Sequence, residues 1–287
     1  MRLPEKFFLS IVLNAFITIA EIIGGILSGS LALVSDAVHN FTDVISLVIG
    51  LLGERFSKRK SDKLHTFGFK RTEVITAFLN GVFLLVIAGW LIIEAFKRLL
   101  NPEELNLSIM LVAAIIGLVG NLLSIFLLHS HREHNLNVKA AYLHLFFDTV
   151  SSIFVVLAVP VIYFTGIRII DPLVTFIIVV FIIKSSYNLI KNTFHILVMG
   201  VPVDQDVELI AQELESIEGI ENIHHVHLWS IDSRNAFISL HAVTSREDTD
   251  EIIKLINSVL RSKFGITHTT IQIEHKNLCD DNVICDQ

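Results

Sequence analysis

Long apolar stretches alternate with short polar connections over the first 200 residues. A membrane-spanning helix needs about 20 mostly apolar residues to cross roughly 30 Å of hydrocarbon. Six stretches reach that length, at residues 7–27, 31–53, 73–96, 107–129, 138–164 and 170–195. The first contains Glu21 and lacks a small-residue cleavage pattern, so we expect a retained span rather than a signal peptide. The pattern therefore predicts an α-helical membrane protein with a six-helix transmembrane domain over residues 1–200.

The pattern changes beyond residue 200, where apolar and polar residues alternate over short distances. Helical periodicity and strand alternation follow one another there, at residues 204–216, 223–231, 236–243, 245–263 and 267–274. Asp204 is expected to cap the first of these helices, and Ser245 with Asp248 resembles a capping box at the start of the second. This α-β-β-α-β order predicts a small ferredoxin-like domain over residues 201–276, with two helices on one face of the sheet. Residues 277–287 are expected to form a polar C-terminal tail.

Composition and charge agree with a membrane protein. Hydrophobic residues make up 52% of the 287 residues and mean hydropathy is +0.64, which soluble domains rarely reach. The net charge of -7 gives no sign of nucleic-acid binding. Basic residues crowd the connection between the second and third spans, namely Arg55, Lys58, Arg59, Lys60, Lys63, Lys70 and Arg71. That side is therefore predicted to be cytoplasmic, and an even number of spans places both termini in the cytoplasm. The chain is expected to lie in a bacterial inner (plasma) membrane, with membrane lipid around its spans.

Two predicted spans carry a histidine and an aspartate four residues apart. The pairs are His39 with Asp43 and His144 with Asp148, and a helix places such positions on one face. Ionisable side chains inside a membrane are costly, so we expect a partner or a role. One pair alone could be a hydrogen bond between helices, but its repetition favours a metal site. Two imidazoles and two carboxylates would suit tetrahedral Zn²⁺.

The segments GSLALVSDAVHNFTD and LNVKAAYLHLFFD, the six spans and the α-β-β-α-β tail resemble the cation diffusion facilitator family. The second span begins its ligand pair with histidine, as in the zinc-transporting branch. The resemblance implies that His39, Asp43, His144 and Asp148 form a transport site. It also implies a homodimer that exports Zn²⁺, or related ions such as Cd²⁺, by proton antiport. The residues fit this mechanism, because metal and protons compete for imidazole near neutral pH.

The same resemblance implies zinc in the soluble domain. The best matches to those ligands are His227, His241, Gln272 and Glu274, with Gln272 replacing a histidine of some members. The alternative is a polar sheet surface whose histidines face water. The C-x₅-C spacing of Cys279 and Cys285 is a weak signal for thiolate ligands.

Two connections carry further candidate ligands. Asp62 and His65 match part of a loop site found in some members, but the third position holds Phe69, so we expect that site to be weak or absent. His129, His131 and His134 lie between the fourth and fifth spans. They either collect zinc on the cytoplasmic side or form a solvated loop.

The sequence also limits other functions. A membrane metalloenzyme would need an open coordination position and a general base, and the sequence offers neither, so we expect a transporter rather than an enzyme. No G-x-x-x-x-G-K-[ST] loop is present, so ATP is not the expected energy source. Export of Fe²⁺, Mn²⁺ or Co²⁺, and a zinc sensor that does not transport, remain alternatives.

Several other polar residues within the spans are expected to have structural roles. Glu21, Asn14 and Asn121 are expected to be helix-packing groups rather than ligands. Asp36 either lies on the exit path or faces water near the membrane surface. Asp171 precedes Pro172 and is expected to cap its own helix.

Overall fold

The structure is a computed structural model of residues 1–287. It describes residues 3–42, 45, 61–129, 136–232, 235–276 and 283. The chain divides into two compact units. The first comprises Met1–Leu51 and Leu79–Leu189, and the second comprises Leu52–Phe78 and Ile190–Gln287. Each is described by itself below.

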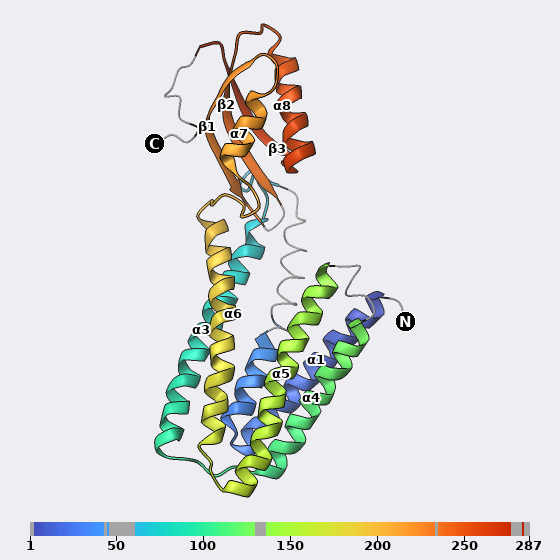
Figure 1. The fold of residues 1–287 in the computed structure, drawn as a ribbon, viewed down its shortest axis with the longest axis vertical. Helices are drawn as coiled ribbons and strands as arrows, with labels where there is room; N and C mark the ends of the chain where they lie inside the picture. The colour runs from blue at the N-terminus through green and yellow to red at the C-terminus, as the bar shows by residue number, and fades with distance from the viewer. Residues whose placement is uncertain are drawn as a thin grey trace. The chain divides into compact units, whose positions relative to one another are not determined.

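The first unit is helical. It holds α1 (Leu3–Ser28), the helical residues 31–42, most of α3 (Arg71–Leu100), α4 (Leu107–His129), α5 (Leu136–Thr165) and most of α6 (Ile170–Leu197) (Figure 1). Among the described residues, α3 to α6 each contain a stretch long and apolar enough to cross a membrane, and α1 contains a shorter one. The predicted helical membrane domain is confirmed. The count of six spans stays a prediction, since the span at 31–53 runs beyond the described residues.

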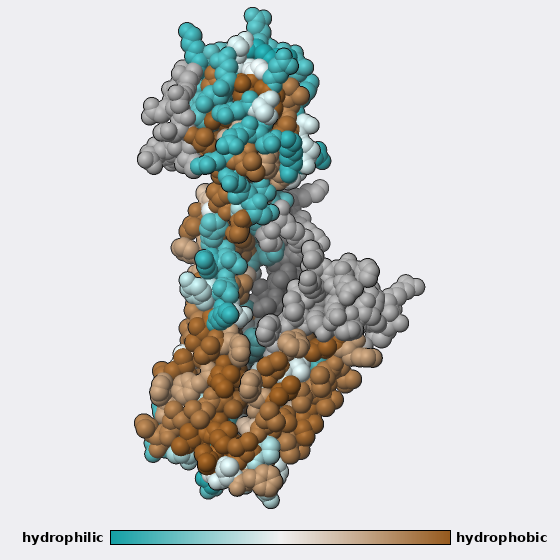
Figure 2. Space-filling view, viewed as in Figure 1, coloured by the Kyte–Doolittle hydropathy of each residue, from teal (hydrophilic) through white to brown (hydrophobic). Residues whose placement is uncertain are grey.

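The helices of the first unit expose apolar side chains, as Figure 2 shows. Phe16, Ile26, Phe126 and Phe164 are each more than half exposed, as expected of side chains that face lipid. Inside the unit, α1 packs along α4 and α4 along α5. Small residues allow this close approach, since a Cβ built at Gly24 would lie 2.2 Å from the Cβ of Ala113.

Asp171 fixes the start of the helix at 31–42. Its carboxylate accepts hydrogen bonds from the Ser30 hydroxyl (2.5 Å) and the Leu31 amide (2.8 Å). Because α6 already begins at Ile170, the prediction that Asp171 caps its own helix is wrong. The carboxylate instead stabilises the positive end of a different helix.

The second unit contains the predicted α-β-β-α-β domain, which is confirmed. Its elements are α7 (Val207–Glu215), β1 (Ile220–Ser230), β2 (Ala236–Thr244), α8 (Thr249–Phe264) and β3 (His268–Glu274). The sheet order is β1-β2-β3, with β1 antiparallel and β3 parallel to β2. The two helices contact each other and the sheet, and their apolar faces form the core with it.

Local signals explain where these helices begin and end. The side chain of Asp206 accepts hydrogen bonds from the amides of Glu208 and Leu209, so α7 starts two residues later than a cap at Asp204 would place it. Asp248 caps α8 through the amide of Glu251, so α8 starts three residues later than the capping box predicted at Ser245 would place it. Gly265 ends α8 with a φ of 68°, in the left-handed region that glycine adopts readily.

Candidate metal centres

His39 and Asp148 meet inside the first unit. The Nε2 atom of His39 lies 3.5 Å from Oδ1 of Asp148, across the boundary between helix 31–42 and α5. The Asp148 side chain is fully buried and that of His39 is 14% exposed. Two ligand atoms bound tetrahedrally to one zinc ion lie about 3.3 Å apart, given bonds of roughly 2.0–2.1 Å. The observed separation therefore suits a shared ion.

Of the two remaining predicted ligands, His144 lies on a described helix. His144 belongs to α5, one helical turn before Asp148, while Asp43 lies outside the described residues. A cavity of about 30 Å³ is lined by His39, Ser151 and Phe181, among others. Its volume suffices for a single water molecule or ion. The structure thus brings one residue of each pair together, and the four-residue site stays a prediction.

Asp36 ties three helices together beside this pair. Its carboxylate accepts hydrogen bonds from the hydroxyls of Ser151 and Ser152, the latter at 3.0 Å. The Asn121 amide of α4 donates in turn to Ser152 (3.2 Å). Asp36 is buried, so it does not face water at the membrane surface.

Asp62 and His65 form a local turn in the second unit. Oδ1 of Asp62 accepts hydrogen bonds from the amides of Leu64 (2.8 Å) and His65 (2.6 Å), and Nδ1 of His65 lies 3.1 Å from it. The backbone hydrogen bonds from His65 and Leu64 lower the pKa of the Asp62 carboxyl. The His65 ring packs on Phe69, with centroids 4.3 Å apart. The pair thus belongs to a turn, and the predicted third position offers a ring instead of a ligand.

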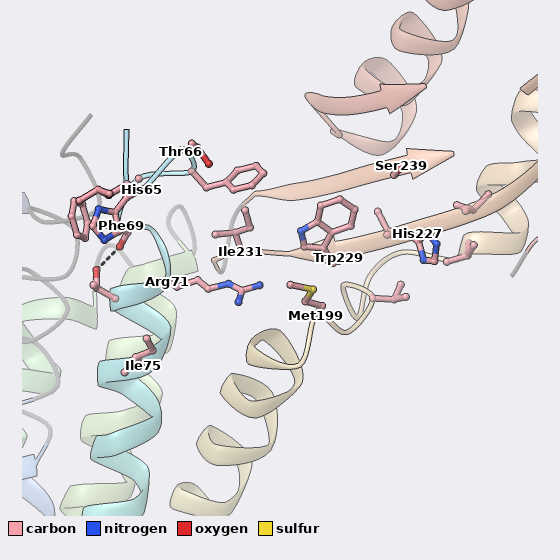
Figure 3. Close-up of a pocket in the computed structure, with 18 residues that line it drawn as sticks. His65, Thr66, Phe69, Arg71, Ile75, Met199, His227, Trp229, Ile231 and Ser239 are labelled. Carbon is pink, nitrogen blue, oxygen red and sulfur yellow. Dashed lines mark hydrogen bonds between the residues drawn. The ribbon is translucent and has the colours of Figure 1, made fainter. Parts of the chain in front are cut away.

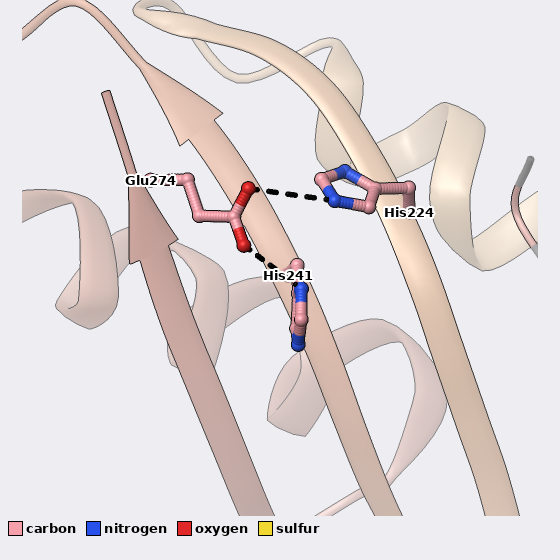
Figure 4. Close-up of side chains that lie close together, drawn as sticks. All are labelled: His224, His241 and Glu274. Carbon is pink, nitrogen blue, oxygen red and sulfur yellow. Dashed lines mark ion pairs between the residues drawn. The ribbon is translucent and has the colours of Figure 1, made fainter. Parts of the chain in front are cut away.

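Three ligand-type side chains converge on the sheet of the second unit (Figure 4). His241 Nδ1 and His224 Nε2 approach the two carboxylate oxygens of Glu274, at 3.0 and 3.6 Å. One ligand atom from each residue lies within 4.8 Å of the others, which is compatible with one ion. The Gln272 amide donates to Glu274 (2.8 Å) and so orients the carboxylate.

An irregularity in β1 decides which histidine joins this cluster. The register shifts between His224 and His227, and His225 has a φ of 52°. His224 consequently pairs with His241, whereas His227 pairs with Ser239. The ligand set implied by the family resemblance and strand position contains His227 and omits His224, which lies in this cluster. A left-handed backbone at a non-glycine residue carries no sequence signal that could have revealed the shift.

His227 lines a large cavity in the second unit (Figure 3). The cavity measures about 940 Å³ and has mostly apolar walls, including Trp229 and Met199. Arg71 extends into it from the start of α3. His227 therefore contributes to this wall, while His241, Gln272 and Glu274 of the predicted set lie together.

Burial favours the neutral form of two histidines of the sheet, His241 and His227. Burial lowers the pKa of His241, Glu274 opposes that shift, and the imidazoles of His225 and His224 add to it. Burial also lowers the pKa of His227, with a further contribution from His225. A neutral imidazole has a lone pair for a metal, so these surroundings favour coordination.

The other predicted ligands fall near or beyond the edges of the described chain. His129 is the last residue of α4. His131, His134, Cys279 and Cys285 lie outside the described residues.

Two models of known protein families match the chain. Residues 7–198 match the family model described as "Cation efflux transmembrane domain". The chain belongs to the cation efflux, or cation diffusion facilitator, family. Residues 202–276 match a second model, described as "Cation efflux protein, cytoplasmic domain". The resemblance to this family is therefore confirmed.

Curated cation efflux relatives align with almost the whole chain. The "Cadmium, cobalt and zinc/H(+)-K(+) antiporter" of Bacillus subtilis is 40% identical over 93% of this chain and 87% of its own. The "Zinc transporter ZitB" of Pectobacterium atrosepticum is 35% identical over 97% and 87%. The "Metal cation efflux system protein CzcD" of Cupriavidus metallidurans is 34% identical over 93% and 85%. Together with the apolar helices, the family identifies an integral membrane protein.

Proposed function

We propose that this family member exports Zn²⁺ from the cytoplasm in exchange for protons. The observation that carries the proposal is the 3.5 Å separation between His39 Nε2 and Asp148 Oδ1. These two atoms belong to different helices. The Asp148 side chain is fully buried and the His39 side chain is mostly buried. The printed names of the relatives, a zinc transporter and a cadmium, cobalt and zinc antiporter, support zinc as the substrate and Cd²⁺ as a further one.

The chemistry of the pair supplies both steps of an exchange. His39 binds a metal only when its Nε2 atom is deprotonated, so an arriving proton displaces the ion. An unperturbed imidazole changes its charge at about pH 6.5, which is within reach of a physiological pH gradient. Because the ligands belong to two helices, movement of helix 31–42 relative to α5 opens the site to one side of the membrane or the other.

The oligomeric state and orientation belong to the same proposal. We infer a homodimer, because residues 202–276 match the cytoplasmic domain of the cation efflux family. Members of this family form dimers through that domain. Cytoplasmic termini follow from the basic connection between the second and third spans, which includes Lys63, Lys70 and Arg71. His224, His241 and Glu274 would hold a resident zinc ion, since two imidazoles and a carboxylate match its donor preference.

Zinc uptake into proteoliposomes tests the transport function. With a pH gradient imposed and a zinc indicator enclosed, the native protein should fill vesicles only when the gradient is present. Asp148→Ala should abolish uptake, because it removes the buried oxygen ligand. Asp250→Ala, an exposed substitution of the same kind on α8, should transport normally. Near-native flux in Asp148→Ala would remove Asp148 from the site.

The same vesicles separate the alternatives. A zinc sensor would bind the ion stoichiometrically without gradient-driven uptake. An exporter of Fe²⁺, Mn²⁺ or Co²⁺ would fill vesicles with that ion more rapidly than with Zn²⁺ when each is supplied singly.

A further inference from the structure

Glu21 is a buried carboxyl group that the zinc site does not use. It lies on α1 with no exposed surface. Asn40 Nδ2 donates a hydrogen bond to its Oε2 atom (2.8 Å). Within the described part of the chain, its Oε1 atom has no hydrogen-bond partner. An ionised carboxylate in a membrane needs a counter-charge or several donors, and here one amide is in place.

Among the described residues, the groups that face Glu21 are acidic or neutral. The titratable side chains that act on it electrostatically are Asp36, on helix 31–42, and Asp148, on α5. The segment of α4 that packs against α1 contains no Asp, Glu, Lys or Arg. At Gly117 of α4 an added Cβ would lie 1.9 Å from Glu21 Oε1. The carboxyl group therefore occupies a space that exists because residue 117 has no side chain.

Glu21 is also joined to the helix that carries His39. Its hydrogen-bond donor among the described residues, Asn40, follows His39 directly in the chain. A movement of helix 31–42 relative to α1 must therefore stretch or break the contact with Glu21. The charge on Glu21 and the position of this helix are thus linked through a single hydrogen bond.

We propose that Glu21 is a second proton-binding site, which releases its proton when zinc binds at His39 and Asp148 and regains it when zinc leaves. The inference rests on the proposed transport function. Binding of Zn²⁺ adds two positive charges to an interior that already contains Asp36 and Asp148. Loss of the Glu21 proton to water leaves a carboxylate and removes one positive charge. Glu21 acts without touching the metal, through charge and through Asn40.

Proton counting on the purified full-length protein tests this role. Zinc is added in weakly buffered detergent solution, and released protons are measured with a pH indicator. Asp148→Ala gives the share that belongs to sites other than the transport site. Glu21→Gln keeps the shape and the Asn40 contact but has no acidic proton. We expect it to bind zinc and to release about one proton fewer per transport-site ion.

Two control variants and three salts test whether the missing proton comes from Glu21. Glu247→Gln, at an exposed position outside the helices, should release protons as the native protein does, and Glu21→Asp should restore the count. An unchanged count in Glu21→Gln overturns the proposal. The measurement is repeated in potassium, sodium and N-methylglucamine salts. A difference that occurs only with potassium or sodium would assign Glu21 to a monovalent cation and overturn the proton site.

Infrared difference spectra of the native protein remain informative if Glu21→Gln does not fold. Zinc addition should remove the C=O band of a protonated carboxyl group, and Glu21→Asp should shift that band. Absence of the band in the native protein overturns the proposal. These equilibrium measurements do not depend on flux, so failure of vesicle uptake with intact proton release would contradict the transport function alone.

Discussion

His224 and His241 lie directly opposite each other on β1 and β2, with ring centroids 5.3 Å apart, and both reach Glu274. The Nδ1 atom of His224 contacts Asn222 Oδ1 at 2.9 Å. Because that oxygen can only accept, the contact holds the proton on Nδ1 and leaves the lone pair of Nε2 toward Glu274. The cluster is thus oriented for coordination by residues outside it.

This arrangement predicts different effects for two neighbouring histidines. In an Asp148→Ala background, which removes the transport site, His224→Ala should weaken zinc binding by more than the roughly 10–100-fold that loss of a supporting residue costs. His227→Ala should bind zinc nearly as the parent does, because His227 lines the cavity instead. Bound zinc after dialysis against graded chelators measures both. If His227→Ala instead weakened zinc binding more than His224→Ala, the ligand would be His227, as predicted from the sequence.

Regular patterns could be predicted from the sequence, whereas contacts without a repeated motif could not. The membrane helices and the α-β-β-α-β order follow from hydrophobic runs and periodicity, which each segment carries locally. The His39–Asp148 approach could be predicted because two spans repeat one spacing. The position of His224, rather than His227, beside His241 depends on backbone geometry at His225, and the Asp171 contact joins residues about 140 positions apart. Neither has a local signal.

His39→Asp should change the choice of metal. The substitution replaces an imidazole by a harder oxygen ligand, which suits Mn²⁺ better than Zn²⁺. We expect the ratio of manganese to zinc uptake to rise on the order of tenfold, which corresponds to about 1.4 kcal/mol. Competition between the two ions in proteoliposomes measures the ratio. An unchanged ratio would argue against His39 as a ligand, and His268→Asp, at an exposed position at the start of β3, serves as the control.

The lowered pKa of His241 predicts how the metal-free protein responds to acid. Between the folded-state pKa and about 6.5, the unfolded chain binds more protons at this residue than the folded chain does. The contribution of His241 to the free energy of unfolding therefore increases with pH across that window and is lost as pH falls. Thermal melts in EDTA from pH 5 to pH 8 should show this trend. His241→Gln should flatten it, and a steeper dependence in the variant would contradict the assignment.

Two glycine substitutions provide a steric test of the membrane unit. Gly117→Ala would place a Cβ 1.9 Å from Glu21 Oε1, so the carboxyl group or α4 must shift. Overpacking of this kind costs about 1–3 kcal/mol, which should lower the melting temperature in detergent. At Gly89 of α3 an added Cβ meets no atom within 4 Å, and alanine stabilises a helix interior by about 0.5–1 kcal/mol relative to glycine. Gly89→Ala should therefore melt at or above the native temperature. Equal melting of the two variants would mean that the carboxyl group of Glu21 has room to move away from α4.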